Sequence, residues 1–191
     1  ELGEKRPALV RSSPREPGAM DQLVRECQEL GLAYIYDPSQ QIVRLSGDDL
    51  RLGIEKAWAL FVNDYEFALI EKSTGWDLAG IRQRNPGILI VVTRGEKGTT
   101  IDSAIAHLEV PIVPAERIVD PTGVGDAFRG GFLTGLRLGL DLLTCGQMGA
   151  LAATYCLEQM GTQSHNYTPA EFVQRYRQNF DDGGKLDILV K

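Results

Sequence analysis

Residues 119–132 read VDPTGVGDAFRGGF, and the interpretation of the whole chain is organised around this stretch. Pro121 fixes the backbone, and Gly123 and Gly125 can adopt the positive φ values that turn successive amide N–H groups toward one point. Helical spacing of apolar residues begins after Asp126. The stretch therefore predicts a cluster of amide donors at a helix N-terminus, where unpaired N–H groups and the helix dipole both favour an anion.

Asp126 has two interpretations at this position. Asp is a preferred residue at helix N-termini and Gly-x-Gly is common in turns, so G-x-G-D alone is more often capping chemistry than catalysis. Here, however, the pattern extends to D-P-T-G-x-G-D-A-F-x-x-G-F, with many specified positions at fixed spacing. The longer pattern favours a phosphate-binding turn with a base in it.

This longer pattern resembles the C-terminal signature of the ribokinase family, also called the PfkB carbohydrate kinases, which includes adenosine kinases. The resemblance implies that the loop of Gly123, Val124 and Gly125 forms an anion hole for the transferred phosphoryl group. It implies that Asp126 takes the proton from the acceptor hydroxyl. ATP is then the phosphoryl donor, and a sugar or nucleoside is the small-molecule partner.

Composition limits the class of protein. The chain has 191 residues, 43% apolar and 24% charged, which is ordinary for one globular domain with a sizeable core. Its net charge of -6 argues against nucleic acid as a partner, because a phosphate backbone is bound chiefly by clustered Lys and Arg. Three cysteines without C-x-x-C spacing suit buried free thiols and not a zinc site. We expect a cytoplasmic protein without a membrane-spanning segment.

Apolar periodicity predicts the elements of the N-terminal part. Residues 8–10 suggest a strand stub, residues 20–30 have helical spacing that stops at Gly31, and residues 33–36 form a short strand. The loop at residues 37–41 either meets a ligand, as loops at strand carboxyl ends do in open α/β sheets, or is a plain turn. Residues 46–49 offer a cap for the next helix.

Asn63 and Glu66 follow a strand predicted at residues 59–62 and allow two interpretations. Asn at an N-cap with Glu three residues later is close to a capping box, a purely structural feature. In the ribokinase family, N-x-x-E after a strand orders magnesium, water and phosphate. By resemblance, Asn63 and Glu66 are assigned to the nucleotide and Glu66 to Mg²⁺, which readily keeps its own water shell.

Residues 88–92 form an unbroken apolar run that is typical of a central parallel strand buried on both faces. The turn after it, from Thr93 to Gly98, lacks the spacing of a Walker A loop. It resembles the family turn that meets the nucleotide phosphates, which assigns Thr93 and Gly95 to the cofactor. A hairpin is expected beyond it, with His107 facing outward and inert.

The C-terminal part is predicted to be mainly helical. Gly131, Gly135 and Gly139 fall four residues apart on one helical face, which would let that helix approach a neighbour closely. A second helix should stop near Gly161, and the capping box at residues 168–171 opens a third. The tail at residues 186–190 has a strand-like pattern.

The resemblance also implies a site for a monovalent cation, such as K⁺, near the nucleotide. In the family, the segment around Gly161 borders the adenine and this cation, whose other ligands match Asp120 and Thr122. His165 either shares this region or is a solvated loop residue. Arg129 pairs either with a phosphate or with a surface acid.

Strand and helix signals alternate through the first two-thirds of the chain, which predicts a mostly parallel central sheet with helices on both faces, a three-layer αβα fold. Asn63, Thr93 and Gly123 all follow apolar runs, so their motifs can meet at one edge of the sheet. A dinucleotide-dependent dehydrogenase is disfavoured, because no G-x-G-x-x-G follows an early strand.

The resemblance covers about residues 14–178 and only the later part of the family pattern. Residues 1–191 are therefore expected to be the nucleotide-binding and catalytic core of a ribokinase-like domain whose N-terminal part and lid lie outside the sequence, which begins without an initiator Met. A homodimer is a further expectation. The alternative function is a non-catalytic nucleotide-binding module that acts through a partner chain.

Overall fold

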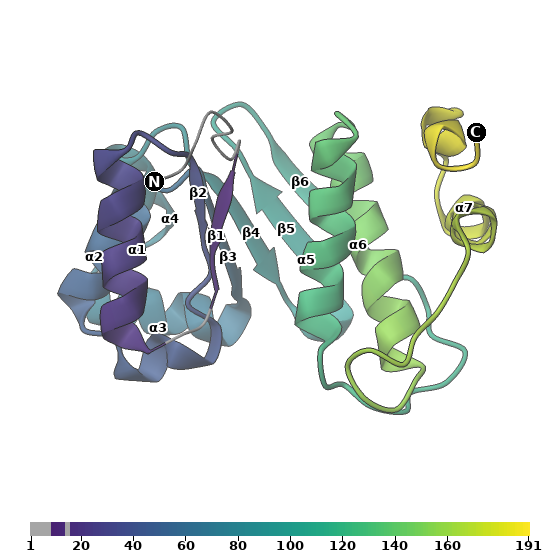
Figure 1. Cartoon of the computed structure of the whole chain (residues 1–191), viewed down its shortest axis with the longest axis horizontal. Coiled ribbons are helices and arrows are strands. Elements are labelled where there is room, and N and C mark those ends of the chain that lie inside the picture. Colours follow the sequence, from purple (N-terminus) through teal and green to yellow (C-terminus); the bar gives the residue numbers. More distant parts are fainter. Residues whose placement is uncertain (1–8, 14–15) are drawn as a thin grey trace. The chain divides into compact units, whose positions relative to one another are not determined.

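The structure is a computed structural model that describes residues 9–13 and 16–191. Among these residues, six strands are hydrogen-bonded in the order β1-β2-β3-β4-β5-β6 (Figure 1). The chain divides into two compact units, which are described in turn. The first comprises Glu1–Arg94 and Asp102–His107, and the second comprises Gly95–Ile101 and Leu108–Lys191.

Strands and helices alternate along the first unit. Its elements are β1 Val10–Ser12, α1 Pro17–Glu29, β2 Tyr34–Tyr36, a 3-10 helix at Ser39–Arg44, α2 Gly47–Glu55, β3 Ala59–Asn63, α3 Asp64–Thr74, α4 Leu78–Arg84 and β4 Leu89–Thr93. The neighbouring pairs from β1 to β4 are all parallel, as the alternation predicted. The expected strand stub is β1, and Ala8 lies outside the described residues.

Short sequence signals set the ends of these helices. α1 has Pro17 at its first position and ends before Gly31, which has a φ of 64° that suits glycine. α4 was not predicted from periodicity. It begins after Asp77, whose Oδ1 accepts a hydrogen bond of 2.7 Å from the Gly80 amide, so the N-cap residue was the available signal.

Both faces of the parallel sheet in the first unit are buried. Tyr34, Leu60 and Ile90 belong to one apolar cluster with side chains of α1 to α4. The alternate residues Phe61 and Val91 point to the opposite face and are at most 2% exposed. This burial explains why the strand sequences are continuously apolar instead of alternating.

The second unit is mainly helical. Its elements are a 3-10 helix at Gly95–Lys97, most of the hairpin strands β5 Thr99–Asp102 and β6 His107–Val110, α5 Val124–Arg137, α6 Leu142–Leu157, α7 Pro169–Asn179 and a 3-10 helix at Lys185–Leu189. The strand-like pattern at residues 186–190 does not form a strand, because Lys185–Leu189 are a 3-10 helix. The Leu186 amide donates to Asp182 Oδ2 at 2.8 Å, and this bond turns the backbone into a helical turn that buries Leu186.

Glycines allow α5 and α6 to pack closely side by side (Figure 1). A Cβ atom on Gly131 would lie 2.5 Å from the Met148 carbonyl oxygen, and one on Gly135 would lie 2.9 Å from Cys145 Sγ. The prediction of close packing is therefore confirmed for these two residues. It was wrong for Gly139, which follows the helix with a φ of 74° and helps to end it.

Two expectations from composition can be compared with the described residues. None of their helices combines the length and apolar character needed to cross a membrane. Cys27, Cys145 and Cys156 are free and buried, as predicted.

Candidate active site

The glycine loop leads directly into the first turn of α5. Gly123 is the N-cap residue, with φ 84° and ψ -3°, and makes no side-chain hydrogen bond to the helix. Val124, Gly125 and Asp126 are the first three helical residues, so the helix starts earlier than the apolar spacing suggested. Because the first N–H groups of an α-helix have no carbonyl partner within it, this start can offer donors to an anion.

The two glycines have different roles. A positive φ occurs at Gly123, where a Cβ atom would also lie 2.9 Å from both Cβ and Cγ2 of Thr162. The expectation of a positive φ was wrong for Gly125, because this residue is already helical. A Cβ atom there would lie 3.6 Å from Arg129 Nη1, so the arginine head lies against the glycine.

Asp126 forms an ion pair with Arg129. Arg129 Nη2 donates to Asp126 Oδ1 at 3.0 Å, and the exposed fractions of the two side chains are 14% for Arg129 and 68% for Asp126. Of the two expectations for Arg129, pairing with an acid is confirmed, and the acid is the predicted base. The i,i+3 spacing on the helix was the sequence signal for this pair.

Four α-helices among the described residues carry an acid at their third position. In α2, α3 and α7, this acid accepts a hydrogen bond from the N-cap amide and completes a capping box. In α5 the N-cap is glycine, and the acid pairs with Arg129 instead. The first turn of α5 therefore differs in its glycine N-cap and in the ion pair that its acid forms with an arginine of the same helix.

Asp120 links the glycine loop to the segment after α6. Its Oδ1 accepts a hydrogen bond from the Thr122 amide and its Oδ2 accepts one from the Gly161 amide, both at 2.9 Å. The hydrogen bonds from Thr122, followed by that from Gly161, lower the pKa of Asp120. The three residues that the resemblance assigned to a cation and the adenine border are thus bonded to one another. Their role toward a ligand stays a prediction.

The segment before the glycine loop is not a strand. The amides of Val119 and Asp120 both donate to the Leu157 carbonyl at the end of α6, and Ile118 is 73% exposed. The apolar run ahead of Gly123 therefore does not add a strand to the sheet, in contrast to the runs ahead of Asn63 and Thr93. Its position is set by α6.

Asn63 and Thr93 lie side by side at the carboxyl edge of the sheet in the first unit. They are paired as the last residues of β3 and β4. Asn63 Oδ1 accepts from the Glu66 amide at 2.7 Å, and Glu66 Oε2 accepts from the Asn63 amide at 2.8 Å. The capping-box interpretation of N-x-x-E is therefore confirmed, and the magnesium role of Glu66, whose exposed fraction is 8%, stays a prediction.

The remaining predicted residues lie in turns and on the hairpin. Gly95 opens the 3-10 turn of the second unit with a φ of 55°. His107 Nδ1 lies 2.7 Å from Asp102 Oδ1, so its ring is paired, and it is 58% exposed. The ring of His165 stacks on that of Tyr167, with centroids 6.2 Å apart, so His165 is not simply solvated.

The donor set limits how a metal could bind. Across residues 9–13 and 16–191, no three His, Cys, Asp or Glu side chains gather into a metal-binding group. A metal cage made entirely of protein side chains does not fit this part of the chain. A Mg²⁺ ion that keeps water ligands and binds nucleotide phosphates needs only one or two carboxylates, and Glu66 fits that requirement.

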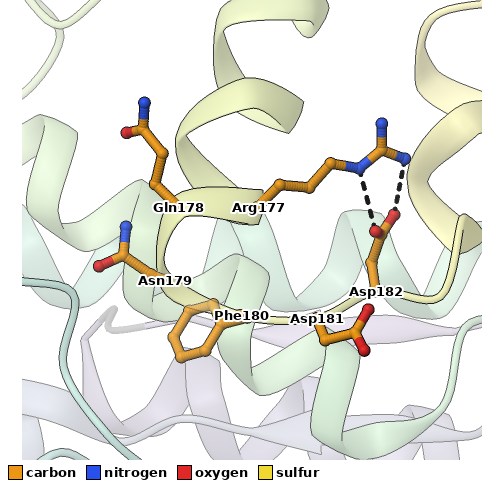
Figure 2. Close-up of a pocket in the computed structure, with 6 residues that line it drawn as sticks. All are labelled: Arg177, Gln178, Asn179, Phe180, Asp181 and Asp182. Carbon is orange, nitrogen blue, oxygen red and sulfur yellow. Dashed lines mark hydrogen bonds and ion pairs between the residues drawn. The ribbon is translucent and has the colours of Figure 1, made fainter.

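A surface pocket at the end of α7 is separate from the predicted residues. Figure 2 shows its lining, which consists of Arg177, Gln178, Asn179, Phe180, Asp181 and Asp182. Arg177 donates to both carboxylate oxygens of Asp182 at 3.0 Å. Because its cation is committed to this pair and no predicted site residue lines the pocket, the candidate active site is the start of α5.

Comparisons with known proteins agree with the resemblance. A nucleoside kinase from Methanocaldococcus jannaschii is 33% identical over 140 residues, which cover 73% of this chain and 46% of that protein. The structure of Burkholderia thailandensis nucleoside kinase in complex with inosine has a TM-score of 0.87 at 36% identity and matches 93% of this chain and 59% of that one. The chain spans about half the length of the curated relatives it matches.

These structural similarities confirm the expected three-layer α/β fold with a mostly parallel sheet. The structure of the M. jannaschii nucleoside kinase, described as an archaeal member of the ribokinase family, has a TM-score of 0.83 at 27% identity and covers 92% of this chain and 58% of that one. The family model of the pfkB carbohydrate kinases matches residues 11–169, well over half of the sequence. The chain therefore belongs to the pfkB family of carbohydrate kinases.

Proposed function

We propose that this chain carries the phosphoryl-transfer centre of an ATP-dependent kinase whose acceptor is a hydroxyl group of a nucleoside or sugar. The observation that carries the proposal is the start of α5, where a glycine N-cap precedes an acid that is 68% exposed. Phosphoryl transfer needs positioning and stabilisation of charge more than covalent chemistry. Backbone amides beside a carboxylate can supply both.

In the proposed step, the amides of Gly123, Val124 and Gly125 bind the phosphoryl group that is transferred. Asp126 accepts the proton of the acceptor hydroxyl. At the same time, the oxygen of that hydroxyl group forms a bond to the γ-phosphorus of ATP. The bond from that phosphorus to the bridging oxygen breaks, and ADP leaves with the electron pair. Arg129 cannot accept the proton, because a guanidinium has donors and no acceptor atom.

The other predicted residues would hold the nucleotide. We propose that Thr93 and Gly95 contact its phosphates and that Asn63 and Glu66 order a hydrated Mg²⁺ ion, which would neutralise phosphate charge. Glu66 Oε2 already accepts the Asn63 amide, which is compatible with coordination through water.

A K⁺ ion is proposed near Asp120 and Thr122, with Gly161 beside the adenine. The hydrogen bonds of Asp120 to both segments support this grouping. Because each carboxylate oxygen has two lone pairs, accepting one amide leaves capacity for a cation.

A nucleoside is the acceptor that we propose to test first. The M. jannaschii relative is named nucleoside kinase, and two structures of the B. thailandensis nucleoside kinase are complexes with inosine and with ADP-inosine. A sugar is the second acceptor class. We also propose a cytoplasmic location, which the free thiols of Cys27, Cys145 and Cys156 support, and leave a homodimer as a further proposal.

The test is the Asp126→Asn variant assayed with ATP and a panel of nucleosides and sugars. We expect the rate of transfer to fall by about 10²- to 10⁴-fold, the usual contribution of a general base, with ATP binding nearly unchanged. Asp141→Asn is the matched control, because Asp141 is also at a helix start and Asn caps helices equally well. Turnover of Asp126→Asn near that of the wild type would contradict the assignment of the base.

The alternative is a nucleotide-binding module without catalysis. A wild-type protein that binds ATP but transfers its phosphoryl group to no acceptor in the panel would favour this alternative. Calorimetry of ATP binding and the transfer assay on the same sample separate the two functions.

A further inference from the structure

We infer that Arg129 is a positioning residue that holds the carboxylate of Asp126 in the orientation required of the base. The inference rests on the proposed function, in which Asp126 accepts the hydroxyl proton. The family pattern leaves the position of Arg129 unspecified, as an x between Phe128 and Gly130. Its role is therefore argued from contacts alone.

The ion pair is asymmetric in its burial. Arg129 is only 14% exposed, whereas Asp126 is 68% exposed. An exposed Asp on a helix can occupy several staggered rotamers, but a mostly buried Arg has its own position fixed by packing. The hydrogen bond of 3.0 Å from Arg129 Nη2 to Asp126 Oδ1 therefore selects one orientation of the carboxylate. Arg129, the more buried partner, sets that orientation.

The guanidinium group of Arg129 lies beside Gly125. A Cβ atom on this glycine would lie 3.6 Å from Arg129 Nη1, 3.8 Å from Nη2 and 3.9 Å from Cζ. A longer side chain at this position would occupy the volume of the arginine head. Gly125 has no positive φ, and these distances are ordinary van der Waals contacts, so they show that the arginine head packs against this residue.

The pair leaves the acid able to act. An ionised carboxylate has about four lone-pair positions, so a bond from Arg129 to Oδ1 does not exhaust its capacity to accept. Its exposed fraction of 68% leaves room for a hydroxyl group to approach. A carboxylate held in one orientation starts from the geometry that proton transfer needs, which removes part of the cost of positioning it.

The first test compares Arg129→Gln and Arg129→Lys with the wild type, using the full protein. We expect Arg129→Gln to lower kcat by about 10- to 100-fold, because a misplaced catalytic group commonly costs that much, while KM for ATP changes by less than about threefold. Arg129→Lys should recover part of the loss, since it keeps the charge but not the planar fork. Arg137→Gln, at an exposed position in the last turn of the same helix, is the matched control.

A double-mutant cycle separates positioning from a structural role. If Arg129 acts through Asp126, adding Arg129→Gln to Asp126→Asn should lower kcat by less than about twofold further, because the group it positions is already disabled. An equal loss in both backgrounds would overturn the inference. The inference would also be overturned if Arg129→Gln lowered both the unfolding temperature and kcat and Arg129→Lys restored neither.

The contact is also tested without any assay of activity. The guanidinium NMR signals of Arg129 should shift in Asp126→Asn and stay unchanged in Asp141→Asn. Signals that do not respond to Asp126→Asn would overturn the inference. Near-normal turnover by Asp126→Asn would instead contradict the proposed function, whereas an inactive Asp126→Asn beside a fully active Arg129→Gln would contradict only the role of Arg129.

Discussion

Two helix starts in this protein place an acid at the same helical position with opposite results. At the start of α3, Asn63 and Glu66 exchange hydrogen bonds and the acid is 8% exposed. At the start of α5, Gly123 has no side chain to exchange, and Asp126 is 68% exposed and paired with Arg129. Both carboxylates lie in the first turn, where the helix dipole favours negative charge.

The comparison shows that the N-cap residue decides what the acid does. A side-chain cap contributes about 1 kcal/mol to stability and satisfies amides that would otherwise bind water or a ligand. With glycine in that place, the protein forgoes this side-chain stabilisation, and the acid of the first turn pairs with Arg129. An acid at the same helical position thus completes a capping box in α3 and forms an exposed ion pair in α5.

The largest effect is expected when the glycine N-cap of α5 is replaced. Gly123→Ala puts a Cβ atom at a φ of 84° and 2.9 Å from Thr162. The strain of a non-glycine residue there, together with this overlap, should lower the free energy of unfolding by about 2–4 kcal/mol and disrupt the amide cluster. Asn63→Ala at the start of α3 should cost only about 0.5–2 kcal/mol, the usual loss of a cap. Urea denaturation measures both.

A second variant separates the two causes. Thr162→Gly in the Gly123→Ala background removes the two side-chain atoms at 2.9 Å but leaves the strained φ and the Cα of residue 162 at 3.1 Å, so stability should recover only in part. Gly123→Ala as stable as Asn63→Ala would show that the glycine is not required by the loop, and the contrast between the two helix starts would fail.

Local signals in the sequence were enough to predict the scaffold, because each strand and most helix ends depend on residues close in the chain. The capping box of Asn63 and Glu66 and the glycine at 123 are of this kind. Contacts that join distant segments could not be predicted. Thr162 lies against Gly123, and the Leu157 carbonyl accepts hydrogen bonds from the Val119 and Asp120 amides, across about 40 residues of sequence. The glycine spacing in α5 predicted a close neighbour but not which residues meet the glycine loop. The ion pair of Asp126 and Arg129 is an intermediate case. Its i,i+3 spacing could be read from the sequence, but the burial of Arg129 could not.

An intermediate effect is expected from Glu66→Gln. Gln at the third position of a helix can still accept the N-cap amide, so the capping box should survive and stability should change by less than about 1 kcal/mol. If Glu66 also orders Mg²⁺, loss of its charge should raise the Mg²⁺ concentration needed for half-maximal transfer by about three- to tenfold. Titration of activity with Mg²⁺, beside thermal unfolding, measures the two roles separately.

The matched variant is Glu66→Ala, which removes the cap and the charge together. It should show the Mg²⁺ dependence of Glu66→Gln and an added loss of stability, since the half-buried Asn63 amide loses its partner. An unchanged Mg²⁺ requirement in Glu66→Gln would mean that the acid of α3 is only structural. The contrast with Asp126 would then be complete.

The smallest effect concerns the link between the loop of α5 and the segment after α6. Asp120→Ala removes the acceptor of the Gly161 amide, so hydrogen exchange of that amide at pH 7 should become about two- to tenfold faster. Asp120→Asn keeps one acceptor oxygen and should show a smaller change. Amide exchange followed by NMR, with the wild type and each variant at the same pH, measures this directly.

The pH dependence of this link follows from the direction of the pKa shift. Hydrogen bonds from Thr122 and Gly161 lower the pKa of Asp120 below its usual 3.8, so the folded form binds its proton less readily than the unfolded form. The contribution of the ionised Asp120 to the stability of the fold is therefore fully present when the pH is above that usual pKa. It is lost as the pH falls through the lower pKa of the folded form. The difference in Gly161 exchange between wild type and Asp120→Ala should be constant from pH 7 to pH 5 and shrink below pH 3.8. If the difference in exchange persists unchanged in strong acid, the Gly161 amide is protected by the packing of the Asp120 side chain and not by its ionised carboxylate. The charge of Asp120 would then contribute nothing to holding the glycine loop.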